Sequence, residues 1–208
     1  MENHILEQDL SGSRQELSVV DGAPGKLFIG RTELEAELDK MAEAINRDYA
    51  GLNPVVVSIL KGAVYFIADL TRRLTIPINI DFLAISRYGT HESDPAGGKR
   101  RPANHRGRTG AVRITKDLDL DIHGRHVLMV EDVIDTGLTL GYVLRSLRAR
   151  GPASLNVCTL LDNPARRLVD LPVRYRGFTI PDHFLVGYGL DYQENYRHLP
   201  EIFVLKKK

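Results

Sequence analysis

The chain has 208 residues, 43% of them hydrophobic, and its 28 lysines and arginines against 27 aspartates and glutamates leave a net charge of +1. This length predicts one domain with a substantial core, and the balanced charge argues against chain-wide attraction to nucleic acid or to an anionic membrane. Because the N-terminus is polar and acidic and no apolar run approaches the ~18 residues of a membrane span, we expect a soluble, cytoplasmic protein.

The first elements along the chain are an irregular arm, a short strand and a helix. Residues 1–26 lack sustained periodicity and contain glycine- and proline-rich stretches, which predicts an arm that leads into a strand over 27–29. Apolar residues then recur at helical spacing, and this pattern predicts a helix over 33–49. Thr32, with Glu35 three residues later, predicts a capping box at the start of that helix.

The centre of the chain alternates strands with helices. Two apolar runs rich in β-branched residues, at 55–60 and 126–133, indicate strands that are buried on both faces. The other predicted elements are helices over 63–73 and 138–150 and strands over 78–85, 112–115 and 154–161. This order predicts an α/β fold with a mainly parallel β-sheet flanked by helices, whose ligand site lies at the carboxyl ends of the strands.

The C-terminal segment differs from the centre, because residues 173–205 carry shorter predicted strands, at 184–186 and 202–205. We interpret this segment as a flap, or hood, over the edge of the sheet. The predicted organisation is a single domain over 1–208. Its parts are a core over 27–161, an arm and hood over 1–26 and 162–208, and a long mobile loop over 87–111.

The strand over 126–133 ends in a turn that carries acids and threonines. Glu131 and Asp132 arrive at the end of the apolar run, and 135–139 (DTGLT) leads into the next predicted helix. Such a turn can direct backbone N–H groups and two hydroxyls at a phosphate placed on a helix N-terminus. It is not a Walker loop, because the GK[ST] ending is missing.

The carboxylates of this turn indicate a second kind of ligand. Adjacent carboxylates repel a phosphate, so we expect Glu131 and Asp132 to face sugar hydroxyls or a divalent cation. A phosphate, a diol and a metal ion together describe a ribose phosphate. The alternative is that Glu131, Asp132 and Asp135 form a solvated acidic loop, but the order of strand, acids, turn and helix favours a ribose phosphate site.

Three motifs share their order with a known family. They are 58–63 (SILKGA), 130–140 (VEDVIDTGLTL) and 180–192 (IPDHFLVGYGLDY). With them the chain resembles the type I phosphoribosyltransferases, and within these the hypoxanthine-guanine phosphoribosyltransferases, from about 29 to about 205. The resemblance implies the type I phosphoribosyltransferase fold with a hood and a mobile catalytic loop. It also implies transfer of ribose 5-phosphate from phosphoribosyl pyrophosphate to hypoxanthine or guanine, which gives IMP or GMP and pyrophosphate.

The resemblance implies roles for the turn after the strand over 126–133. Glu131 and Asp132 would hold the ribose hydroxyls, and Asp135 would be the general base at purine N7. A carboxylate accepts that proton only where burial or nearby negative charge raises its proton affinity, and bound phosphates supply such charge. The residues expected to wrap the 5-phosphate are Asp135, Thr136, Gly137, Leu138 and Thr139.

The resemblance also implies a pyrophosphate site built from distant segments. A glycine after a strand end lets the backbone approach an anion closely, and a lysine there supplies a point charge. Arg87 stands where the family usually has a serine, and arginine is expected to pair with pyrophosphate more strongly than serine. The expected residues are Leu60, Lys61, Gly62, Arg87, Tyr88 and Arg197.

The hood is expected to bind the purine and a metal ion. The resemblance implies that Phe184 stacks on the base and that Leu185 offers its backbone carbonyl to the base edge. Without the family context, Phe184 is more typical of a core residue. Asp191 is expected to hold Mg²⁺, together with Glu131 and Asp132.

One purine-binding position departs from the family. A lysine that donates to the 6-oxo group is common where this chain has Asn163. An ammonium group can only donate, whereas an amide can donate or accept, so discrimination against 6-aminopurines is left open. We therefore expect either oxopurine activity at reduced affinity or a preference shifted toward xanthine or another purine.

The basic segment 99–113 opens a further alternative, because it contains six lysines or arginines and no acid. We expect a loop that closes over the anionic substrate. The alternative is a regulatory phosphoribosyltransferase-like protein that binds RNA, which is less favoured because the segment lacks aromatic residues for base stacking. The resemblance also implies a homodimer or homotetramer.

Overall fold

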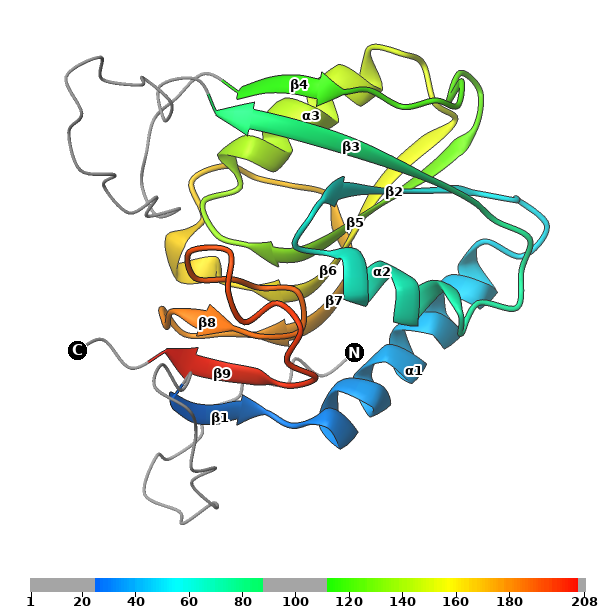
Figure 1. The fold of residues 1–208 in the computed structure, drawn as a ribbon. Coiled ribbons are helices and arrows are strands. Elements are labelled where there is room, and N and C mark those ends of the chain that lie inside the picture. Colours follow the sequence, from blue (N-terminus) through cyan, green and yellow to red (C-terminus); the bar gives the residue numbers. More distant parts are fainter. Residues whose placement is uncertain (1–24, 88–111, 206–208) are drawn as a thin grey trace, which may run out of the picture.

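The protein was analysed as a computed structural model, which describes residues 25–87 and 112–205. The main sheet has six strands in the order β4-β3-β2-β5-β6-β7 (Figure 1). All neighbouring pairs are parallel except β3 and β4, which confirms the mainly parallel sheet expected from the sequence. The strands are β2 (Val55–Leu60), β3 (Asn79–Arg87), β4 (Val112–Lys116), β5 (His126–Ile134), β6 (Ser154–Asp162) and β7 (Val173–Thr179).

A second sheet joins the two ends of the described chain. Antiparallel strands β1 (Gly25–Ile29), β9 (Ile202–Leu205) and β8 (Leu185–Val186) form it in that order. We call this sheet, together with residues 180–201, the hood. The hood starts later than expected, because β7 extends the main sheet beside β6, with Tyr175 and Phe178 buried.

Helices α1 (Arg31–Asp48), α2 (Val64–Thr71) and α3 (Leu138–Arg148) and the short 3₁₀ helix η1 (Pro164–Arg166) complete the fold. The predicted capping box is wrong. The N-cap of α1 is Gly30, no side chain caps the helix, and Thr32 lies within the first turn. Glycine is accepted at this position, and Glu33 in the first turn complements the helix dipole. In the part of the chain that the structure describes, no helix combines the length and apolar character required to span a bilayer.

The helices cover opposite faces of the main sheet. Side chains of β5 alternate between the two faces, because successive residues of a strand point to opposite sides. Leu128 and Val130 join the cluster under α1 and α2, whereas Val127 and Met129 join the cluster under α3. The unbroken apolar run in β5 is therefore explained by burial on both faces.

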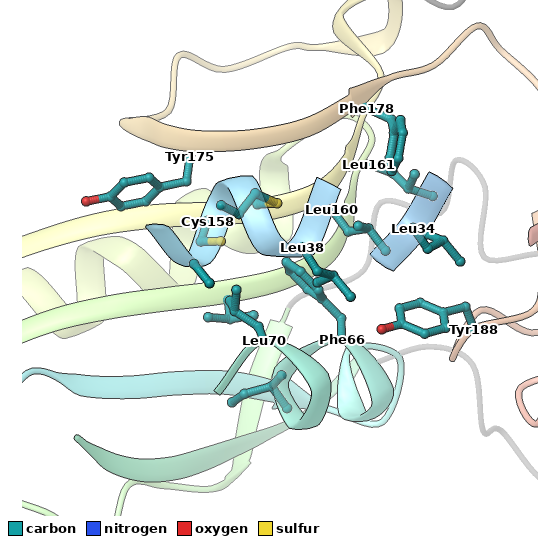
Figure 2. Close-up of a cluster of buried hydrophobic side chains, with 14 of the residues drawn as sticks. Leu34, Leu38, Phe66, Leu70, Cys158, Leu160, Leu161, Tyr175, Phe178 and Tyr188 are labelled. Atoms are coloured by element: carbon teal, nitrogen blue, oxygen red, sulfur yellow. The ribbon is translucent and has the colours of Figure 1, made fainter. Parts of the chain in front are cut away.

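The cluster under α1 and α2 is the larger core (Figure 2). Leu34 and Leu38 of α1 pack there with Phe66 and Leu70 of α2 against Cys158 of β6. Phe66 is fully buried, and truncating such a residue to alanine costs about 3–5 kcal/mol. This core fixes the strand ends from which the loops of the candidate site emerge.

Candidate active site

Three segments meet at the carboxyl ends of β2 and β5. A methyl group on Gly62, in the loop between β2 and α2, would overlap the Asp132 carboxylate at the end of β5. A methyl group on Gly189 of the hood would overlap the carbonyl oxygen of Gly62, and Gly189 also has a φ of +98°. At Gly189 glycine is required, because the obstacle is backbone and the φ is left-handed, whereas at Gly62 a side chain would displace the Asp132 carboxylate.

The end of β5 holds two acids in a buried setting. Oε1 of Glu131 is buried and has no hydrogen-bond partner among the described residues. Burial, followed by the charge of Asp132, holds the pKa of Glu131 well above its usual range. Burial also raises the pKa of Asp132, although the N–H of Val133 and the charge of Arg197 act in the opposite direction. An oxygen such as Glu131 Oε1 is suited to a ligand that donates a hydrogen bond.

The turn between β5 and α3 is tight. Gly137 is the N-cap of α3 and adopts the left-handed conformation, with a φ of +77°. The N–H of Leu168 donates to the carbonyl of Thr136 at 3.0 Å, which holds the turn against the segment that follows η1. The first turn of α3 contains no acidic residue. The N-terminus of α3 can therefore receive an anion without competition from a carboxylate of its own.

Asp135 lies in this turn and forms an ion pair. Its Oδ1 is 2.9 Å from Nε of Arg166, and Nη1 of Arg166 is 3.2 Å from Oδ1 of Asp182. Oδ1 of Asp135 is buried and accepts no hydrogen bond, so the guanidinium meets it out of line for N–H donation. The Asp135 side chain as a whole is nevertheless 34% exposed to solvent. Because Oδ1 is buried, this exposed surface belongs to the other atoms of the side chain.

The cationic side of the site draws on the hood. Nζ of Lys61 is 3.0 Å from Oε2 of Glu194, and both side chains are mostly exposed. The hydrogen bond from Lys61 lowers the pKa of Glu194. Arg197 places Nη2 2.7 Å from Oδ1 of Asp191 and donates from Nη1 to the carbonyl of Gly189. Both cations thus have carboxylate partners within the protein.

The expected purine-binding residues lie around η1 and the start of the hood. Phe184 is only partly buried, and its ring meets that of Tyr192 edge to face with centroids 5.6 Å apart. Leu185 is buried in β8. Asn163 is also buried, and its Oδ1 accepts no hydrogen bond from the described residues.

Some expected site residues cannot be placed. Tyr88 and the basic segment from 88 to 111 lie outside the described residues, and for Arg87 only the backbone, at the end of β3, is described. Leu60 ends β2 and is exposed, and its peptide bond to Lys61 is cis.

Sequence reasoning missed Arg166 and Glu194. Pro164 directly after Asn163 marks a turn, which was a usable signal that Arg166 folds back toward the strand ends. Glu194 carries no local signal, because its partner Lys61 is 133 residues away in the sequence.

The geometry agrees with what related proteins show. A family model for the phosphoribosyl transferase domain matches residues 30–193. The chain therefore belongs to the phosphoribosyltransferase family. Within that family, similar proteins are named hypoxanthine-guanine or hypoxanthine phosphoribosyltransferases, which confirms the resemblance drawn from the three motifs and the fold expected from it.

Two relatives and one solved structure illustrate this similarity. The hypoxanthine-guanine phosphoribosyltransferase of Mycobacterium tuberculosis (strain ATCC 25618 / H37Rv) is 43% identical over 197 residues, 92% of this chain and 91% of that protein. The hypoxanthine phosphoribosyltransferase of Haemophilus influenzae is 44% identical over 176 residues, 83% of this chain and 90% of that protein. A crystal structure of a hypoxanthine-guanine phosphoribosyltransferase from Bacillus anthracis superposes with a TM-score of 0.78 at 40% identity, and covers 88% of this chain and 100% of that one.

Proposed function

We propose that the protein is a purine-salvage phosphoribosyltransferase that transfers the ribose 5-phosphate of phosphoribosyl pyrophosphate to hypoxanthine or guanine and releases pyrophosphate. The observation that carries the proposal is the meeting of Gly62, Asp132 and Gly189. Asp132 belongs to the acidic end of β5, which leads into the turn before α3, and the cations Lys61 and Arg197 flank Gly62 and Gly189, so this meeting supports a site for a ribose phosphate with a pyrophosphate leaving group. The names of the relatives at 43–44% identity support the same activity.

The donor's ribose phosphate is assigned to the turn between β5 and α3. Ribose hydroxyls donate to Glu131 and Asp132, and this satisfies the buried Oε1 of Glu131. The 5-phosphate accepts from the backbone and hydroxyls of Thr136, Gly137, Leu138 and Thr139 at the N-terminus of α3.

The pyrophosphate is assigned to Lys61, Gly62 and Arg197, with Leu60, Arg87 and Tyr88 as further members of that site. Lys61 and Arg197 reach it by exchanging their carboxylate partners, Glu194 and Asp191, for phosphate oxygens. The pair of Lys61 with Glu194 is exposed, and such pairs are worth about 0.2–1 kcal/mol, so Lys61 makes this exchange easily, whereas the pair of Arg197 with Asp191 is largely buried.

Mg²⁺ is the proposed cofactor, with Asp191, Glu131 and Asp132 as the residues that hold it. Among the described residues no three His, Cys, Asp or Glu side chains form a ready cluster for a metal ion. Mg²⁺ commonly binds through one or two carboxylates and completes its shell with water and substrate phosphates. Besides burial, the charge of Asp191 contributes to the raised pKa of Asp132, which supports assigning these two carboxylates to one site. When bound, the ion neutralises charge that develops on the departing pyrophosphate.

The acceptor base is assigned to Asp135, Phe184 and Leu185. Phe184 stacks on the purine, Leu185 contributes its backbone carbonyl, and Asp135 removes the proton from N7 as the bond to the ribose forms. The exposed part of the Asp135 side chain makes this transfer accessible, whereas Oδ1 is covered by Arg166. The developing positive charge on the ribose is stabilised by the neighbouring carboxylates.

We also propose a cytoplasmic location and a homodimer or homotetramer, which rest on the family resemblance. The RNA-binding alternative is not favoured, because the relatives are named for catalysis. A shifted base preference would be visible in the experiment below.

The test is pyrophosphate release from phosphoribosyl pyrophosphate with hypoxanthine, guanine, xanthine or adenine, each with and without Mg²⁺. We expect release with hypoxanthine and guanine that depends on the metal. Release with xanthine alone would mark a shifted preference. No release with any of the four bases in the presence of Mg²⁺ would refute the proposed function.

A further inference from the structure

Arg166 lies between the proposed general base and the hood. Its guanidinium is 2.9 Å from Oδ1 of Asp135 through Nε and 3.2 Å from Oδ1 of Asp182 through Nη1. The side chain is 25% exposed, so it is held in place but still reachable. Among the described residues, Arg166 is the cation that pairs with Asp135.

The geometry of a 6-oxopurine determines what Arg166 would meet. N7 and the 6-substituent lie side by side on one edge of the base, and an arginine can address that pair of atoms together. A base that presents N7 to Asp135 therefore has its 6-substituent beside that carboxylate, with which the cation Arg166 pairs. A guanidinium has five N–H donors and no acceptor, so it matches an oxo group and opposes an amino group.

We infer that Arg166 is the specificity-determining residue that selects a 6-oxo over a 6-amino group on the purine. The inference rests on the proposed role of Asp135 at N7. It assigns to Arg166, in η1, the discrimination between 6-oxo and 6-amino groups that the side chain of Asn163 does not provide. The amide of Asn163 is buried and can donate or accept, so it does not by itself exclude either substituent.

The contacts of Arg166 leave donors for the base. Nε faces Asp135 out of line for a hydrogen bond and Nη1 donates to Asp182, so these two carboxylates engage only part of a guanidinium that has five N–H donors. Asp182 holds the other end of the guanidinium and lies two residues before Phe184, the proposed stacking residue. One short segment of the hood therefore positions both the plane of the base and the donor at its edge.

Binding of two nucleotides separates this role from a structural one. IMP carries the 6-oxo group, and purine riboside 5′-monophosphate has hydrogen in its place. We expect Arg166→Gln to weaken IMP roughly 10- to 100-fold, the usual effect of losing a hydrogen bond from a charged donor, and to leave the second nucleotide almost unchanged. Arg166→Lys, which keeps a cationic donor, should recover part of the difference. Calorimetric titration of both ligands gives the dissociation constants.

The controls keep folding and function apart. Arg148→Gln removes an equal charge from an exposed position in the last turn of α3 and should change neither dissociation constant. Asp182→Asn keeps the guanidinium but removes its second partner, and should weaken IMP by a smaller factor, roughly three-fold, with no effect on the other nucleotide. This second variant tests the inference even where Arg166→Gln does not fold.

Two results would overturn the inference. One is an equal effect of Arg166→Gln on both nucleotides, including no effect on either. The other is a loss of selectivity in Asn163→Ala that Arg166→Gln does not share. Pyrophosphate release by the unaltered enzyme with hypoxanthine tests the proposed function separately, so an active enzyme without Arg166-dependent selectivity would sink only the inference.

Discussion

The ribose end and the pyrophosphate end of the proposed donor site differ in whether their charged groups already have partners. At the end of β5 and in the turn that follows it, the acids come from one stretch of chain, and the buried Oε1 of Glu131 has no hydrogen-bond partner among the described residues. On the opposite side, Lys61 and Glu194 are 133 residues apart, pair directly and are mostly exposed. The first end carries an unpaired buried acid, whereas at the second both cations already face carboxylates, with only Nε of Arg197 buried and without a hydrogen-bond partner among the described residues.

This difference indicates that the two ends bind their ligands in different ways. Polar groups fixed before the ligand arrives require no reorganisation during the reaction, so the ribose end is suited to stabilise the transition state. The pyrophosphate end must exchange partners each time substrate enters and product leaves. The exposed pair of Lys61 with Glu194 is suited to repeated binding and release. The predictions below test this division, in order of decreasing effect.

The largest effect is expected at Asp135. Asp135→Asn keeps the shape of the turn but removes the proton acceptor, so kcat should fall roughly 10²-fold or more. The KM for phosphoribosyl pyrophosphate should change little, because the 5-phosphate contacts come from the N-terminus of α3. Steady-state kinetics with hypoxanthine measures both constants. Unchanged turnover would remove Asp135 from the reaction.

The next effect is expected where the two ends touch. Gly62→Ala places a methyl group on the Asp132 carboxylate, and overpacking of this kind costs about 1–3 kcal/mol. We expect kcat/KM for phosphoribosyl pyrophosphate to fall roughly ten-fold or more. Gly30→Ala is the matched control, because a methyl group there meets nothing closer than 3.9 Å. Equal kinetics for the two variants would show that the close approach at Gly62 is not required.

A smaller effect of opposite sign is expected at the pyrophosphate end. Glu194→Gln removes the charge that competes for Lys61 and Arg197, so the KM for phosphoribosyl pyrophosphate should fall roughly two- to five-fold. The gain should diminish at high salt, where exposed charges are screened. Glu35→Gln, which breaks an exposed pair with Arg31 on α1, serves as the control. A raised KM would show that Glu194 helps to form the site.

The smallest effect on catalysis is expected outside both ends. Asp48 joins α1 to β7 by accepting hydrogen bonds from Arg174 and Tyr175. Burial favours a higher pKa for Asp48, but these hydrogen bonds outweigh it and lower the pKa. Asp48→Asn should therefore reduce the free energy of unfolding by roughly 1–2 kcal/mol at neutral pH and leave kcat/KM unchanged.

The pH dependence of that loss has a definite sign. A lowered pKa stabilises the folded protein above the ordinary value of 3.8 and stops doing so as the pH falls through the folded-state pKa. The difference in thermal stability between the two proteins should thus be full at neutral pH and shrink in acid. A difference that grows in acid, or altered kinetics, would contradict this account.

Sequence patterns predicted the scaffold and one end of the site better than the other. Apolar runs such as Val55–Leu60 were enough to locate buried strands, and the acids at the end of β5 and in the turn after it were identified because strand, acids, turn and helix follow one another in the sequence. The capping box at Thr32 failed because Gly30 takes the N-cap. The residues of β7 were interpreted as part of the hood, because nothing in their sequence indicates that they pair with β6. Only the structure shows that pairing.

Contacts between distant segments explain the remaining misses. The pair of Lys61 with Glu194 and the contact of Gly62 with Asp132 depend on how the hood meets the sheet, which no local pattern encodes. Arg166 was missed because a three-residue 3₁₀ helix is too short to give a periodic signal. The base-selecting part of the site was therefore the least accessible to sequence reasoning.

The pairing of β1 with β9 has a consequence for how the protein is made. Gly25 pairs with Leu205, so the hood sheet requires strands from opposite ends of the described chain. A nascent chain on the ribosome that has reached residue 180 already contains every strand of the main sheet and the turn between β5 and α3. It lacks β8, β9, Phe184 and Asp191. During translation the proposed ribose phosphate end can therefore form first, and the hood side of the proposed purine site is completed only when the last strand has emerged and paired with β1.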